Sequence, residues 1–162
     1  MKSIQYVQDV IIFLKDMNVI TDSDVAELYG VKTRDVNKAV KNNPDNFPKG
    51  YIYELSIEEK NELAENFHRF ERLKHTTVNP KAFSEKGLYM LTTIIKSKKA
   101  TGTTIGIIET YAKIRELSKM LSSISEMSND SDQKKIMKKS GTIITELLEN
   151  NLKTMRQKPL LN

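Results

Sequence analysis

The sequence has no cysteine and no long apolar run. The absence of cysteine excludes disulfides, thiolate zinc sites and cysteine nucleophiles. The longest apolar stretch, residues 10–14, is far shorter than the roughly 20 residues that a membrane-spanning helix needs. No apolar stretch with a small-residue cleavage site follows Met1, so we expect a cytoplasmic protein without a secretory signal.

Signatures of catalysis are also missing. There is no P-loop, no GxSxG and no GxGxxG. Four glutamates share one helix face, but no apolar pocket is evident that would separate their pKa values for acid–base work: Glu58, Glu59, Glu62 and Glu65. The only histidines are His68 and His75, and they lack a third clear ligand for zinc. We therefore expect no enzyme, no cofactor and no metal.

Positive charge is present in excess and is unevenly distributed. The formal net charge is +5, with 26 Lys and Arg against 21 Asp and Glu. Residues 32–50 carry five basic residues against two acids, and residues 67–99 carry eight against two. Two basic blocks on one face would attract phosphate, although lysine-rich surfaces also serve solubility alone.

Hydrophobic periodicity and capping residues predict an α+β fold that is mostly α: a helix-turn-helix-like N-terminal domain with short strands, followed by long amphipathic C-terminal helices. The three aromatic residues Tyr29, Phe47 and Phe83 are expected in the core. A buried strand or the end of a short helix is expected at 10–14, strands at 51–55 and within 76–80, and a loop at 122–132. Helices are expected at 22–29, 34–42, 56–73 and 85–95, from residue 103 or 104, and at 133–155, with fraying at 158–162.

The strongest functional signal is a helical pair between residues 21 and 43. Thr21 is placed to cap the first helix, Gly30 to end it, and Thr33 to cap the second helix. Two short helices joined by a turn with glycine are typical of a helix-turn-helix. The alternative interpretation is an ordinary surface helix of an α+β domain.

The outer face of the second helix carries groups that suit DNA. Arg34 and Asn37 are predicted to read bases, since Arg pairs with guanine and Asn with adenine through two hydrogen bonds. Lysine side chains suit phosphates. The complete predicted DNA-binding set is Lys32, Thr33, Arg34, Asn37, Lys38, Lys41, Asn42 and Lys81.

A series of motifs in fixed order strengthens this prediction. They are the segment from Val19 to Val31 with Leu28-Tyr29-Gly30-Val31; Val36-Asn37 and Asn42; Phe47-Pro48; the step from Tyr53 to Ser56; Ala82-Phe83-Ser84-Glu85-Lys86-Gly87; Met90-Leu91; and Ala100, Ile107 and Ile114-Arg115-Glu116-Leu117. With these motifs, residues 8–117 resemble the KilA-N-type DNA-binding domain of the phage "open reading frame six" N-terminal family. The resemblance implies a domain of phage and prophage regulators, including antirepressor-like proteins.

One region departs from that family pattern. Family members often have a Gly/Arg-rich aromatic loop before the Ala-Phe-Ser-Glu step, whereas residues 67–81 are basic and contain no glycine. This segment is either a solvated extension of the third helix or a DNA contact.

The C-terminal helices cannot bury their apolar faces alone. We predict a DNA-binding domain at 1–117 and a helical oligomerisation or partner-binding region at 118–162. The helices either fold back as a hairpin or pair with a second copy, and a homodimer on double-stranded DNA is favoured. The alternative function is a protein-interaction module, such as an antirepressor that captures a repressor through these helices.

Overall fold

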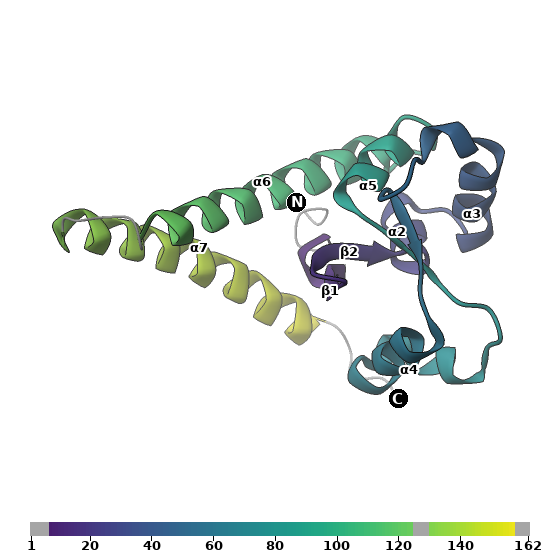
Figure 1. The fold of residues 1–162 in the computed structure, drawn as a ribbon, viewed down its shortest axis with the longest axis horizontal. Helices are drawn as coiled ribbons and strands as arrows, with labels where there is room; N and C mark the ends of the chain where they lie inside the picture. The colour runs from purple at the N-terminus through teal and green to yellow at the C-terminus, as the bar shows by residue number, and fades with distance from the viewer. Residues whose placement is uncertain (1–6, 125–129, 158–162) are drawn as a thin grey trace. The chain divides into compact units, whose positions relative to one another are not determined.

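The structure is a computed structural model that describes residues 7–124 and 130–157 (Figure 1). It is mostly helical with one small antiparallel sheet, which confirms the predicted α+β class. The chain divides into two compact units, one formed by residues 10–101 and the other by 1–9 with 102–162. The predicted boundary after residue 117 stays a prediction.

Four short strands form the sheet of the 10–101 unit, in the order β1-β2-β4-β3. They are β1 (Ile12–Leu14), β2 (Met17–Thr21), β3 (Ile52–Glu54) and β4 (Lys81–Phe83). Strands β1 and β2 form a hairpin whose turn residues, Lys15 and Asp16, have φ values of 52° and 60°. Two successive positive φ values match the right-handed twist of the paired strands, so this turn sets the register.

The prediction of a strand within 76–80 was wrong, because the strand lies at Lys81–Phe83 instead. The β-branched residues 76–78 suggested a strand, but Val78 is 75% exposed. Ala82 and Phe83 are buried, and they pair with β2 on one side and β3 on the other. Burial between two neighbouring strands therefore outweighs the local preference for β structure.

The helical pair forms as predicted, with one correction. Helix α2 spans Asp22–Tyr29; the Thr21 hydroxyl accepts from the Asp24 N–H, and Gly30 ends the helix with a left-handed φ of 69°. Helix α3 spans Thr33–Asn42. Thr33 is its first residue rather than its cap, because the Asp35 carboxylate accepts from the Lys32 N–H at 3.3 Å and so fixes the turn one residue earlier.

The third predicted helix ends sooner than expected. Helix α4 spans Ile57–Asn66 and begins with the predicted capping box of Ser56 and Glu59. Phe67 has an extended backbone, and a 3-10 helix, η2 (His68–His75), follows it. The break places Phe70 in a core that also contains buried residues of β1, β2, β4 and α4 and the residue that follows β3: Ile12, Val19, Ala82, Leu63 and Leu55. A shorter 3-10 helix, η1 (Pro44–Asn46), follows α3.

Helix α5 (Glu85–Thr92) packs close to the start of β3. The Ser84 hydroxyl accepts from the Gly87 N–H and donates to the Gly50 carbonyl at 2.8 Å. A Cβ at Gly87 would collide with the Tyr51 carbonyl oxygen. The Ser-Glu-Lys-Gly motif is therefore a cap combined with a close approach of helix and backbone. The helix ends at residue 92, earlier than expected, although Ile95 remains buried.

The second unit is built mainly from two long helices, α6 (Ala100–Ile124) and α7 (Asp130–Gln157). Helix α6 begins earlier than the expected residue 103, and the helices occupy both ends of the expected 122–132 loop, of which 125–129 lie outside the described residues. The expected fraying at 158–162 also lies outside them. Near the connection, Gln133 donates to the Ile124 carbonyl at 3.1 Å, and Lys139 lies 3.9 Å from Glu116. The helices are thus antiparallel neighbours there.

Candidate nucleic-acid interface

Helix α3 has one buried side and one solvent-facing side. Val36 is fully buried, and it is the side chain that anchors α3 against the rest of the domain, where α2 is its neighbour. Arg34, Lys38 and Lys41 are exposed and recur at intervals of four and three residues. This spacing places them in one stripe along the helix, over roughly 10 Å of its length at 1.5 Å per residue.

The stripe is electrostatically uncompensated. The only acid within α3 is Asp35, and its carboxylate is engaged by the Lys32 N–H. Over residues 7–124 and 132–145, whose side chains the structure describes, no carboxylate forms an ion pair with Arg34, Lys38 or Lys41. Three such cations on a fixed helix face form a surface suited to an anionic ligand.

Asn37 lies differently from the rest of the predicted set. It is half-buried, and its amide donates to the Asp22 carboxylate at 3.2 Å, across the helical pair. Its Oδ1 atom is buried and has no hydrogen-bond partner among the described residues. The side chain therefore joins α3 to the start of α2, and it could read a base only by leaving Asp22.

The other four predicted residues lie at four different positions. Lys32 is exposed in the turn before α3, Thr33 is half-buried at its start, and Asn42 is exposed at its end. Lys81 is on a separate element, in β4, where its Cα partner is Glu54 of β3. The structure thus brings together the residues from the turn and α3, and it leaves Lys81 on the sheet.

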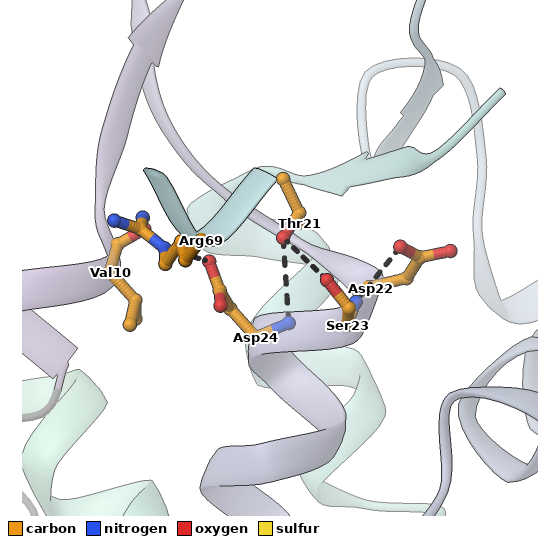
Figure 2. A network of polar contacts seen from close by, with 6 residues as sticks. All are labelled: Val10, Thr21, Asp22, Ser23, Asp24 and Arg69. Atoms are coloured by element: carbon orange, nitrogen blue, oxygen red, sulfur yellow. Dashed lines mark hydrogen bonds and ion pairs between the residues drawn. The ribbon is translucent and has the colours of Figure 1, made fainter. Parts of the chain in front are cut away.

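A partly buried ion pair contacts α2 from η2 (Figure 2). Arg69 of η2 donates through Nε to the Asp24 carboxylate at 3.3 Å and through Nη2 to the Val10 carbonyl at 3.5 Å. The guanidinium carbon lies 4.4 Å from the ring centre of Phe70 and 5.1 Å from that of Phe67. Arg69 is therefore no part of a simple extension of α4: its side chain remains 32% exposed, but its guanidinium is paired with Asp24.

Burial dominates the electrostatics of this pair. It raises the pKa of the Asp24 carboxyl above its usual value, although the positive charge of Arg69 and the hydrogen bonds from Arg69 and Thr21 oppose the rise. The ion pair was not predicted. Nothing local in the sequence links Asp24 to an arginine 45 residues away.

The expected core aromatics are in the core. Tyr29 and Phe83 are fully buried, and Phe47 is half-buried with its ring edge-on to Phe83, 6.5 Å between centres. Among the residues that the structure describes, no group of three or more His, Asp or Glu side chains is arranged to hold a metal ion. The expectation that the protein uses no metal or cofactor stays a prediction.

The 10–101 unit is an α+β domain in which a four-stranded antiparallel sheet supports a helical pair with a basic outer face. The family model described as "ORF6N domain" matches residues 9–94, more than half of the chain. The chain belongs to this family, as its motifs predicted, and is a phage-type protein. Neither a curated protein nor a solved structure matches the chain. None of the described helices combines the length and the apolar character that crossing a bilayer requires.

Proposed function

We propose that this protein is a non-enzymatic DNA-binding regulator in which α3 enters the major groove of a duplex. The observation that carries the proposal is the exposed stripe of Arg34, Lys38 and Lys41 on a helix whose opposite side is anchored by buried Val36. A helix of this width fits the major groove, and its basic face neutralises phosphates while it reads base edges.

Each residue has a separate role in this proposal. Arg34 is near the N-terminal end of α3, the end that contacts base edges in helix-turn-helix proteins, so we assign it to base recognition. Asn37 contributes to base recognition only if its amide leaves Asp22. The phosphate contacts are assigned to the remaining set: Lys32, Thr33, Lys38, Lys41, Asn42 and Lys81.

Binding to labelled duplexes, followed by fluorescence anisotropy over a salt series, tests the proposal. A random duplex pool first supplies a selected sequence. Arg34→Ala should reduce the free energy of binding to the selected duplex by about 1–3 kcal/mol, and the protein should then discriminate less between this duplex and random DNA. Lys41→Ala should weaken binding to both duplexes and lower the salt slope by about 1. Lys135→Ala, an exposed change on α7, is the matched control.

Two results would overturn the proposal. One is a parent protein whose affinity for duplex DNA does not weaken as salt rises. The other is a doubly substituted protein, Arg34→Ala with Lys41→Ala, that binds as the parent does.

We also propose that a second copy of the chain covers the exposed apolar residues of the long helices. These residues are Ile105, Ile108 and Leu121 on α6 and Met137 and Ile144 on α7. Five large apolar side chains left exposed on two helices favour an interface, and a two-fold dimer presents two α3 helices to one duplex.

Sedimentation equilibrium should give a dimer, and Ile108→Glu with Leu121→Glu should give a monomer. A monomeric parent contradicts the dimer. In that case, capture of a phage repressor by residues 102–162 would support the antirepressor alternative.

A further inference from the structure

We infer that the segment Lys96–Lys99 is a second DNA-phosphate contact, attached directly to the turn of the helical pair. This inference rests on the proposed function, because it assigns a further part of the surface to the same duplex. The segment follows the residues that the family model matches, which end at residue 94. Its sequence, Lys-Ser-Lys-Lys, predicted only the end of a helix.

A short hydrogen bond holds the segment in place. The Ser97 hydroxyl donates to the Tyr29 carbonyl at 2.7 Å, and Tyr29 is the last residue of α2. The aliphatic chain of Lys99 lies over the next residue: a Cβ built on Gly30 would be 3.1 Å from its Cδ atom. Segment and turn are therefore in direct contact although they are nearly 70 residues apart in sequence.

The segment is also anchored on its own side. Leu91 and Ile95 are buried, and the Ile95 N–H donates to the Leu91 carbonyl at 3.0 Å. The Ala100 N–H donates to the Ser97 carbonyl at 3.1 Å and closes a turn before α6. Because both flanks are fixed, the lysines are presented by a defined backbone rather than by a free loop.

The charges point to a polyanion. Lys96, Lys98 and Lys99 are exposed, and no ion pair engages them among the side chains of residues 7–124 and 132–145. Exposed Lys32 follows Gly30 by two residues in the same turn. The segment thus adds three cations to the end of the helical pair from which α3 departs.

The position favours DNA backbone over other anions. In helix-turn-helix complexes the second helix lies in the major groove and the first helix crosses the backbone. A basic segment on the turn that joins them meets the row of phosphates at the groove edge.

A local alternative also exists, since α2 has no basic residue in its last turn and Lys99 could offset the helix dipole there. That effect would involve one lysine and would not depend on DNA.

The test compares two variants with equal charge change. One carries Lys96→Gln, Lys98→Gln and Lys99→Gln; the control carries Lys134→Gln, Lys135→Gln and Lys138→Gln, three exposed lysines of α7. Duplex affinity is measured by anisotropy between about 50 and 200 mM salt, on the selected sequence and on random DNA. Thermal unfolding of each variant checks that the fold is retained.

We expect the first variant to lower the slope of log affinity against log salt by about 2 to 3, since each phosphate contact contributes about 0.9. The first variant should lose affinity for the selected and the random duplex by the same factor, because phosphate contacts carry no sequence information. The control should keep the slope of the parent. Ser97→Ala, which only releases the anchor, should lower the slope less than the triple substitution, and Ser97→Thr should restore it.

Two outcomes would overturn the inference: a first variant with the slope of the parent, or equal losses in both variants, which would show an effect of net charge alone. Failure of the proposed function is distinguishable, because the parent itself would then not bind duplex DNA, or Arg34→Ala would change nothing.

Discussion

Replacing Arg69 with Met tests whether its ion pair with buried Asp24 holds η2 and α2 together. Met keeps an unbranched apolar chain against Phe67 and Phe70 but removes the charge that faces Asp24. Asp24 is only 5% exposed, so its carboxylate would be left buried without its cation. Uncompensated buried charge is among the costliest single changes in a protein.

The expected cost follows from the geometry. At the observed separation of 3.3 Å, an effective dielectric constant of about 20 gives a gross attraction of about 5 kcal/mol. Most of it is offset by the desolvation of Asp24, and Arg69 is itself 32% exposed and therefore screened. We expect Arg69→Met to lower the free energy of unfolding by about 2 kcal/mol at pH 7, between the values for exposed and fully buried pairs.

The sign of the pH dependence is fixed by Asp24. Its pKa in the folded protein is raised, so the folded state holds the proton more tightly than the unfolded state, and stability falls as pH rises through that pKa. Without Arg69 the pKa rises further, so the loss extends to higher pH. The cost of Arg69→Met should therefore grow from pH 4 to pH 7.

Urea unfolding at several pH values measures these quantities. Arg72→Met is the matched control, because Arg72 is exposed in the same 3-10 helix; it should change stability by less than about 0.5 kcal/mol. A double-mutant cycle that adds Asp24→Asn should give a coupling energy between Arg69 and Asp24 of about 1–2 kcal/mol at pH 7. Equal costs for Arg69→Met and Arg72→Met, or a cost independent of pH, would refute this reasoning.

Three further predictions concern stability. Gly30→Ala should cost about 1 kcal/mol in thermal unfolding, because φ is 69°, whereas Gly141→Ala, with open space around it in α7, should be neutral or stabilising. Gly87→Ala should cost more than about 3 kcal/mol by the same assay, since its Cβ meets backbone. Glu59 accepts from the Ser56 N–H, which with Lys15 lowers the pKa of its carboxyl. The stability that the Glu59 carboxylate contributes is therefore present above the usual pKa and is lost on acidification. The difference in stability between the parent and Glu59→Gln should shrink from pH 6 to pH 3.

Capping residues made the helix starts predictable. Thr21, Ser56 and Ser84 all bond the backbone N–H three residues on, as their positions in the sequence indicated. Gly30 ends α2 in the left-handed region for the same local reason. These features are encoded within four residues of one another, so a single sequence suffices to find them.

Features that depend on distant partners were not predictable. The β4 strand exists because β2 and β3 flank it, and its residues 81–83 carry no stronger local signal than residues 76–78. The break at Phe67 likewise depends on the core that Phe70 fills. The bond between Asn37 and Asp22 joins residues 15 apart, and periodicity alone placed Asn37 on the outer face.

Charge density alone therefore does not identify which cations face a partner. Arg69 lies in a basic block, yet its guanidinium is committed to Asp24. Lys99 lies in the same block and remains exposed at the turn of the helical pair, where the Ser97 hydroxyl bonds the segment to the Tyr29 carbonyl. The sequence shows both residues as equivalent positive charges. The small polar anchors and buried carboxylates around them decide which charge is paired within the protein and which is left for a polyanion.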